Sequence, residues 1–415
     1  MRVVLAAGKR GHYYLTARAL HRAGVLHRFV TSTFFSKTGL RKRLAPHRRV
    51  AVRSDDALND APVVSLWGIE LGYRIATGVA GRHAALRRIY NDRFDRALRR
   101  HLGGGDVLHV ANTYGWHSMH AAKQRGMRVV LDQQSAHPDY LRMCREHVYP
   151  LHGLRPPPTD EVRESRIRDE IANADLILVP SRFVLDENLR RGIEPERLRF
   201  VPIGVDTTLF RPGPAPAPAA PNGPLRVLFA GTASVLKGAV TLLRAAERFG
   251  DRRIELTFAG AVRDEMRPFL EACAAPIRLT GPVTQQHLAG LFREADLLCL
   301  PSYVEGSALV VYEAMACGLT CVVTRQAGSV VRDGADGLIV SAGAPEELAE
   351  TFAKLHTWPE WRAELGVAAR NRALDFDVLD YGQRLLAAYD LLDLPQRALS
   401  TQGAGEPAAE APRVQ

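Results

Sequence analysis

The sequence predicts an α/β protein made of two doubly wound domains that face each other across a cleft. Its 415 residues exceed what one hydrophobic core usually supports, so two domains are expected. Short apolar stretches alternate with amphipathic ones along nearly the whole chain, a pattern typical of βα units and parallel sheets. A Pro/Ala-rich stretch, PGPAPAPAAPNGP, separates two such runs.

In the first run, apolar stretches predict buried strands at Val3–Ala6, Leu26–Thr31, Val107–Val110, Arg128–Leu131, Leu176–Val179 and Arg199–Val201. Amphipathic stretches predict helices near 12–23, 83–102, 115–125, 161–173 and 182–191. The segment 54–82 is ambiguous. Its stretch LWGIELGYRIATGVAG could form an amphipathic helix on the surface, but helices of this composition are more often packed in a core, which we favour.

The second run predicts strands at Leu225–Ala230, Ile254–Ala259, Ile277–Thr280, Leu297–Leu300, Thr320–Thr324 and Leu338–Val340. Helices are expected near 238–249, 264–274, 284–294, 307–317, 346–357, 358–374 and 377–393. The predicted organisation is a first domain (1–205), a linker (206–224), a second domain (225–375), a helix packing back toward the first domain (376–395) and a disordered tail (396–415).

The net charge is +10, with basic clusters at 36–53 and 82–100. Such clusters suit nucleic acid, anionic lipid or a phosphorylated substrate, and a solvated arginine-rich face is an equally good interpretation. No nucleic-acid-binding module is present in the sequence, so we expect no nucleic-acid partner. The five cysteines form no CxxC pair and indicate a reducing compartment. No apolar run is long enough to span a membrane, and the N-terminus is interpreted as a strand, not a secretory signal.

The segment EGSALVVYEAMACG, residues 305–318, carries the strongest chemical signal. A strand ending at Pro301 is followed by a loop and a helix expected to start near Ser307. The first amides of a helix have no acceptor within it and, with the helix dipole, favour an anion such as a diphosphate. We expect these amides to be those of Ser307, Ala308 and Leu309, with Gly306 allowing close approach.

Two glutamates, Glu305 and Glu313, flank this predicted anion site. With a helix between them they lie roughly 12 Å apart, too far for the carboxylate pair of a glycosidase. One carboxylate could instead accept hydrogen bonds from sugar hydroxyls and the other from ribose hydroxyls. The spacing alone would rank no higher than chance, but its place on a strand–loop–helix unit with phosphate-binding amides between the carboxylates predicts a nucleotide-sugar site.

These motifs together resemble family-4 retaining glycosyltransferases of the GT-B fold, glycosyltransferase group 1 type. The resemblance covers nearly the whole chain and is strongest across 199–340. It includes VPIGVDTTLFRP before the linker, VLFAGTASVLKG at the start of the second domain, and the run from LTGPVTQQHL to LTCVVT that contains both glutamates.

The resemblance implies a donor site in the second domain. Glu313 would bind the ribose, Glu305 the donor sugar, and Lys237 would neutralise the departing diphosphate. Many family members carry an arginine where this chain has Thr232. Thr232 and Ser234 could still hydrogen-bond the donor phosphate in its place. Val283 would meet the base through its backbone.

In the first domain, the loop Gly8 to Gly11 resembles the glycine-rich loop that lies over the donor phosphates, so Gly11 is expected there. His137 matches the histidine that faces the reacting sugar. Trp116, His117 and Gln134 are candidates for the acceptor side.

The implied activity is metal-independent transfer of a sugar from a nucleoside-diphosphate sugar to a hydroxyl acceptor, with no cofactor and with retention of configuration. The Asp375-Phe376-Asp377 triplet is interpreted as a helix cap, not a metal site. The basic clusters suit an anionic or membrane-associated acceptor, and a cytoplasmic location, peripheral at the inner membrane surface, is expected. Two alternatives stay open: a nucleotide-sugar epimerase or hydrolase, and an inactive donor-binding subunit.

Overall fold

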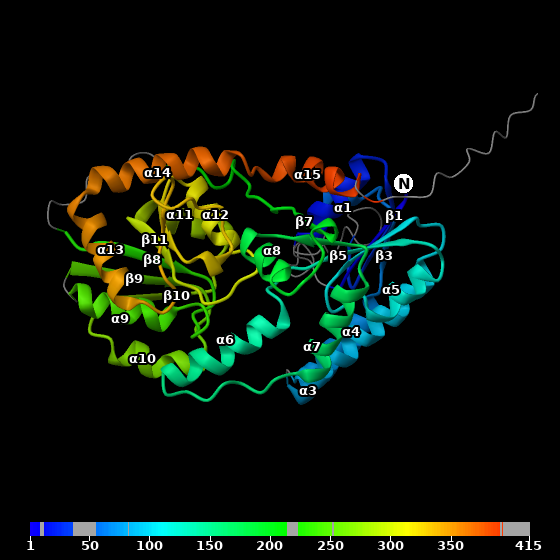
Figure 1. The fold of residues 1–415 in the computed structure, drawn as a ribbon, viewed down its shortest axis with the longest axis horizontal. Coiled ribbons are helices and arrows are strands. Elements are labelled where there is room, and N and C mark those ends of the chain that lie inside the picture. Colours follow the sequence, from blue (N-terminus) through cyan, green and yellow to red (C-terminus); the bar gives the residue numbers. More distant parts are fainter. Residues whose placement is uncertain are drawn as a thin grey trace, which may run out of the picture.

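The computed structural model describes residues 1–8, 12–35, 55–81, 83–213, 223–250, 253–390 and 392. The whole basic cluster at 36–53, the linker residues 214–222 and the tail from 393 onward therefore lie outside the described residues. Figure 1 shows two α/β domains side by side along the long axis of the molecule. Both predicted sheets are present and fully parallel, which confirms the two-domain α/β fold class.

The first domain contains a 7-stranded sheet in the order β3-β2-β1-β4-β5-β6-β7. Its central strands are rich in valine, leucine and isoleucine and are almost completely buried, as expected for a parallel sheet covered on both faces, whereas its edge strands are half-buried. The strands are β1 (Val3–Ala7), β2 (Leu26–Thr31), β3 (Val63–Ser65), β4 (Val107–Ala111), β5 (Arg128–Asp132), β6 (Leu176–Val179) and β7 (Leu198–Phe200). The helices are α1 (Tyr13–Arg22), α3 (Trp67–Ala80), α4 (Ala84–Leu98), α5 (Trp116–Lys123), α6 (Pro138–Leu151), α7 (Glu161–Asn173) and α8 (Arg182–Leu189).

The second domain contains a 6-stranded sheet in the order β10-β9-β8-β11-β12-β13. Its strands are β8 (Leu225–Ala230), β9 (Ile254–Ala259), β10 (Ile277–Gly281), β11 (Leu297–Leu300), β12 (Thr320–Val323) and β13 (Leu338–Ile339). Its helices are α9 (Ala239–Phe249), α10 (Arg267–Ala272), α11 (Gln285–Glu294), α12 (Leu309–Ala316), α13 (Pro345–Thr357) and α14 (Pro359–Leu374). Each predicted strand of this domain is found within one residue of its expected ends.

The chain passes between the domains at two adjacent places. Val205 forms a parallel bridge with Asp377, and the Val205 amide donates to the Phe376 carbonyl over 2.9 Å. Phe210, in the segment we assigned to the linker, is 1% exposed within the core of the second domain. After the second crossing, α15 (Tyr381–Tyr389) packs beside α1 of the first domain (Figure 1). The Asp377 carboxylate accepts from the Leu379 amide at the start of a short 3₁₀ turn, in agreement with its predicted role as a cap.

Helix α6 was not predicted, and it joins the two domains. Although it follows β5 of the first sheet, Val148 and Tyr149 near its C-terminus are buried in the core of the second domain. The Tyr149 hydroxyl donates to Glu265 over 3.1 Å. The sequence signal is weak because Pro138 and Pro150 lie within the helix and its apolar face contacts a distant part of the chain.

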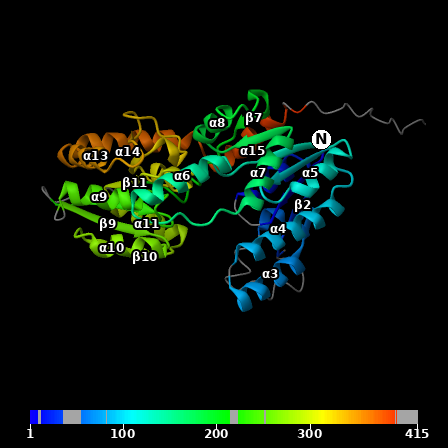
Figure 2. The same ribbon diagram turned by 60° about the horizontal axis from the view of Figure 1, so that its bottom comes forward.

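The preference for a packed core helix within 54–82 is wrong. Helix α3 lies on the outer edge of the first domain beyond α4 (Figure 2). Four apolar side chains spaced four residues apart are exposed along one face: Trp67 at 59%, Leu71 at 48%, Ile75 at 60% and Val79 at 87%. We call these four residues the α3 ridge. Within the described residues, no helix combines the length and apolar content needed to cross a bilayer.

Candidate active site

The order of the second sheet determines where its ligand crevice lies. The chain leaves β8 toward β9 on one side and later returns to place β11 on the other, so the strand order reverses between β8 and β11. Ligands of open parallel sheets bind beyond the carboxyl ends of the strands at such a reversal. The loop 231–238 follows β8 and the loop 301–308 follows β11, and these loops carry most of the predicted donor-binding residues.

Lys237 and Glu305, from these two loops, form an ion pair. Their side chains are 27% and 17% exposed, so both are accessible to a ligand. Gly238 fixes the position of the lysine, because its φ is +73° and a Cβ there would lie 2.0 Å from the Pro301 carbonyl oxygen. The structure therefore brings together two residues that are far apart in sequence and holds the first loop against the end of β11.

The start of α12 differs from the prediction. The helix begins at Leu309, and the Ala308 amide, expected to face an anion, donates to the Ala327 carbonyl over 3.0 Å. That amide is not available to a ligand in this structure. The amides of Ser307 and Leu309 form no backbone hydrogen bond within the described residues. In the β8 loop, Thr232 and Ser234 flank Ala233, whose amide donates to the Ala261 carbonyl over 2.8 Å.

Glu313 lies on α12 and faces the loop that follows β10. Burial raises the pKa of Glu313 to about 7, although a hydrogen bond from the Gln285 side chain acts in the opposite direction. Gln285 starts α11, two residues after Val283, so the predicted base-contacting residue lies close in sequence to the side chain that hydrogen-bonds the predicted ribose-binding carboxylate. Sequence reasoning missed Gln285, for which the only local signal is its position at the start of a helix.

Gly306 contacts the first domain. A Cβ at this position would lie 1.7 Å from the Gln134 carbonyl oxygen, so only glycine permits the backbone of the two domains to approach this closely. The Ser181 hydroxyl donates to the Gly306 carbonyl over 2.5 Å. The structural reason for this glycine is thus a domain contact, whereas the sequence suggested approach to an anion.

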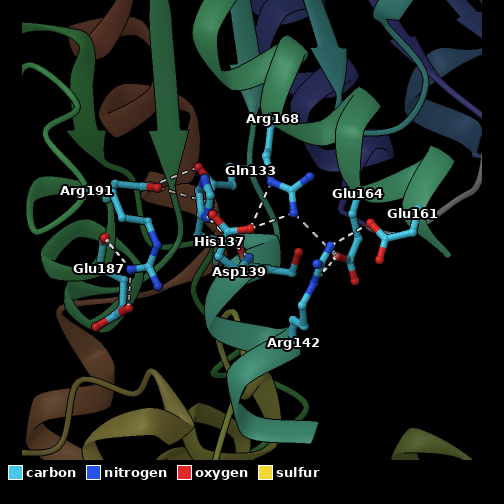
Figure 3. A network of polar contacts seen from close by, with 11 residues as sticks. Gln133, His137, Asp139, Arg142, Glu161, Glu164, Arg168, Glu187 and Arg191 are labelled. Atoms are coloured by element: carbon cyan, nitrogen blue, oxygen red, sulfur yellow. Dashed lines mark hydrogen bonds and ion pairs between the residues drawn. The ribbon is translucent and has the colours of Figure 1, made fainter. Parts of the chain in front are cut away.

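His137 precedes α6 and is 7% exposed. Its Nδ1 accepts from the Asp139 amide over 3.3 Å, and Asp139 in turn pairs with Arg168 over 2.7 Å (Figure 3). Burial lowers the pKa of His137 to about 4, so the ring is neutral at neutral pH. With Nδ1 accepting, the proton is placed on Nε2, which can then donate to a sugar hydroxyl.

Gln134 belongs to a buried polar cluster that the sequence did not predict. Its side-chain amide donates to the Tyr13 hydroxyl and lies 3.2 Å from His12 Nδ1. His12 Nε2 lies 2.6 Å from Asp132 Oδ2. Burial alone would raise the pKa of Asp132, but the charge and hydrogen bond of His12 lower it below its usual value. His12 immediately precedes α1, the first helix after β1, and Asp132 ends β5, so only the strand order β1-β4-β5 brings them together.

Trp116 and His117 are held by other helices of the first domain. The Trp116 Nε1 donates to Asp169 over 3.1 Å, and the Arg166 guanidinium lies 5.3 Å from its ring centre. His117 Nε2 lies 2.9 Å from Asp92. The structure therefore ties these two candidates to α4 and α7, and forms no hydrogen bond between them and Gln134. Gly11 lies outside the described residues.

No cluster of three or more His, Cys, Asp or Glu side chains within the described ranges could hold a metal ion. The absence of a metal requirement stays a prediction.

Comparison with known families and proteins agrees with the two-domain fold. Residues 11–209 match the model for Glycosyltransferase Family 4, and residues 224–357 match the model for Glycosyl transferases group 1. The chain is similar to D-inositol 3-phosphate glycosyltransferase 1 of Catenulispora acidiphila, with 30% identity over 74% of this chain and 76% of that protein. A shorter match, to D-inositol 3-phosphate glycosyltransferase of an Arthrobacter strain, has 34% identity over 44% of this chain and 47% of that protein.

Solved structures share the fold at low sequence identity. Sucrose-phosphate synthase from Thermosynechococcus elongatus has a TM-score of 0.65 and 18% identity, covering 94% of this chain and 98% of its own. HepE of Anabaena in complex with UDP has a TM-score of 0.63 and 14% identity, and the match covers 94% of this chain and 100% of the HepE chain. The two parallel sheets, both family matches and the 30% identity to the Catenulispora protein lead to one conclusion: this chain is a member of the family-4, group 1 glycosyltransferases with the GT-B fold.

Proposed function

We propose that this glycosyltransferase transfers a sugar from a nucleoside-diphosphate sugar to a hydroxyl acceptor, with retention of anomeric configuration and without a metal or cofactor. The observation that carries the proposal is the Lys237–Glu305 ion pair at the crevice where the strand order reverses. The solved complex of HepE with UDP and glucose, on a similar fold, supports a nucleotide-sugar donor.

Each group has a defined task in this proposal. The bond between the anomeric carbon and the diphosphate oxygen breaks, and a bond to the acceptor oxygen forms on the same face. The acceptor proton passes to an oxygen of the departing diphosphate. Lys237 stabilises the negative charge that accumulates on the diphosphate, since a fixed cation in a partly dehydrated site stabilises charge better than water does. Glu305 accepts from sugar hydroxyls, Glu313 accepts from ribose hydroxyls, and neutral His137 donates to the reacting sugar.

The test compares the ion pair with a matched pair outside the crevice. Lys237→Met and Glu305→Gln should each lower the kcat/KM of transfer by roughly 100-fold or more, as expected when a group that stabilises transition-state charge is lost. Arg248 and Glu346 form a similar pair at the far end of α9, 2.7 Å apart and largely exposed, so Arg248→Met and Glu346→Gln should keep full activity. UDP-, GDP- and ADP-sugars serve as donors, and the anomeric configuration of the product is determined by NMR.

Three outcomes would contradict the proposal. Near-normal transfer by Lys237→Met or Glu305→Gln would show that the substituted residue does not have the role proposed for it in transfer. Full-rate donor consumption without any acceptor would favour a nucleotide-sugar epimerase or hydrolase. Nucleotide binding with no turnover across a broad acceptor panel would favour an inactive donor-binding subunit.

We also propose that the protein is cytoplasmic and binds the inner membrane surface through the α3 ridge. A row of apolar side chains beginning with tryptophan suits the boundary between lipid headgroups and acyl chains. An exposed arginine of the neighbouring helix α4, Arg93, would complement anionic lipids.

Sedimentation with phosphatidylglycerol/phosphatidylcholine vesicles tests this. Ile75→Asp with Val79→Asp should abolish most of the binding. Val367→Asp, at a residue on α14 that is 64% exposed, should leave it unchanged. Equal binding by both variants would refute the role of the ridge.

A further inference from the structure

Ser181 is a residue of the first domain that holds a loop of the second domain. It follows β6 and caps α8, which lies between the two domains in Figure 1 and contacts the turn at residues 325–327. Only 1% of the residue is exposed. The Ser181 hydroxyl donates to the Gly306 carbonyl over 2.5 Å, across a separation of 125 residues in the chain. A buried hydrogen bond therefore joins the first domain to the loop that carries Glu305.

The hydroxyl of Ser181 has two partners, and each uses a different part of the group. Its oxygen accepts from the Val184 amide over 3.2 Å, which caps the first turn of α8. The Gly306 carbonyl can only accept, so the hydroxyl hydrogen points to it. A helix cap needs the oxygen alone. The hydrogen is therefore available for a second task, the contact with the other domain.

Gly328 makes room for this contact. Its φ is +64°, and a Cβ there would lie 2.6 Å from the Gly306 carbonyl oxygen and 2.9 Å from Ser181 Oγ. On another side, a Cβ on Gly306 itself would lie 1.7 Å from the Gln134 carbonyl oxygen. The peptide group after Gly306 is thus enclosed by atoms of both domains, and its orientation is restricted.

The orientation of this peptide group decides where the Ser307 amide points. In a trans peptide the C=O and the following N–H point in opposite directions, and no peptide bond in the described part of the chain is cis. Because the Gly306 carbonyl points to Ser181, the Ser307 N–H points away from it. This N–H has no backbone partner within the described residues, whereas the next amide, that of Ala308, is already bound to the Ala327 carbonyl.

We propose that Ser181 is a positioning residue of the donor site: by holding the Gly306 carbonyl, it aims the Ser307 amide at the diphosphate of the nucleotide sugar. The inference rests on the proposed function, because it takes the diphosphate to lie at the start of α12. It also makes a phosphate-binding amide of the second domain depend on a side chain of the first. The donor site is then complete only while the two domains touch at Gly306.

The test compares ligands with and without the diphosphate on the full-length protein. Titration calorimetry uses UDP, GDP and ADP, with uridine, guanosine and adenosine as the probes that lack phosphate. Ser181→Ala should weaken binding of the preferred nucleoside diphosphate about tenfold, because a hydrogen bond to a charged phosphate is lost. Affinity for the matching nucleoside should change less than twofold. Ser181→Thr keeps the hydroxyl and the cap, so its affinity for the nucleoside diphosphate should stay within about twofold of the wild type.

A second variant separates loss of the helix cap from loss of the contact between domains. Asp160 caps α7 in a similar way, since its carboxylate accepts from the Arg163 amide over 3.1 Å. Asp160→Ala and Ser181→Ala should both lower the thermal midpoint, because each loses an N-cap. Only Ser181→Ala should lose affinity for the nucleoside diphosphate.

Three results would overturn the proposal: equal affinity of Ser181→Ala and Ser181→Thr for the nucleoside diphosphate, an equal loss of affinity for nucleoside and nucleoside diphosphate in Ser181→Ala, or an equal loss in Asp160→Ala. Each of them would leave the proposed transfer reaction standing if Lys237→Met still loses transfer. A wild-type protein that binds no nucleoside diphosphate would contradict both the proposed function and this inference.

Discussion

Glu313 should destabilise the native protein at neutral and alkaline pH, and its replacement by glutamine should reveal this. Burial places the pKa of Glu313 at about 7, against an ordinary value of 4.5. Each pKa unit corresponds to about 1.36 kcal/mol, so ionising this buried carboxyl costs the native state about 3 kcal/mol above pH 7. Between pH 4.5 and 7 the native state holds a proton that the unfolded chain has released, so stability falls as pH rises through this window.

Glu313→Gln removes this titration and keeps the shape of the side chain. We expect the variant to match the wild type in stability at pH 4.5 and to be more stable by about 3 kcal/mol at pH 8. This difference corresponds to a rise of several degrees in the thermal midpoint for a domain of this size. Donor affinity should fall about tenfold or more, because a neutral amide replaces the carboxylate proposed to bind the ribose.

The assay is thermal and urea unfolding of both proteins from pH 4.5 to 8, with nucleotide binding followed by calorimetry. Glu360→Gln, at an exposed position at the start of α14, is the control and should follow the wild type at every pH. A Glu313→Gln variant that is less stable at pH 8, or that follows the pH dependence of the wild type, would refute the reasoning.

Two further predictions concern the cleft. Burial lowers the pKa of His137 to about 4, so the unfolded chain binds its proton first as pH falls, and stability is lost between about pH 6.5 and 4. His137→Gln should flatten the dependence of unfolding free energy on pH in this window, as measured by urea unfolding. It should also lower the kcat of transfer, as measured by initial rates. An unchanged pH dependence of stability would contradict the burial argument. Gly306→Ala should lower kcat/KM by roughly 100-fold, because its Cβ would force the two domains apart at Gln134. Gly290→Ala, where a Cβ meets nothing within 4 Å, should be neutral, and equal activity of the two variants would show that this domain contact is dispensable.

Local sequence patterns predicted every described strand except β3, because a strand buried on both faces must be continuously apolar, as in LILV of β6 and LLCL of β11. Helices with one apolar face were also found. Helix α6 was missed because part of its apolar face packs on the second domain, and α3 was misjudged because composition does not reveal whether an apolar face has a neighbour. The position of Glu313 on a helix after β11 could be predicted, but its raised pKa could not, since burial depends on the loop that brings Gln285 to it.

By itself the sequence determined the α/β class and the two sheets, and it predicted a donor-type site at Glu305 to Gly318, since these depend on short-range periodicity and motif spacing. Only the tertiary structure decided the contacts made across long separations in the chain. It pairs Lys237 with Glu305 and places Gly306 against the Gln134 carbonyl. It also makes the Ala308 amide unavailable to a ligand, because this amide donates to the Ala327 carbonyl. The same tertiary structure brings the Ser181 hydroxyl of the first domain to the Gly306 carbonyl of the second. The physical reason is that charge balance and burial are properties of side chains that meet in space, and no local pattern records which distant side chains will meet.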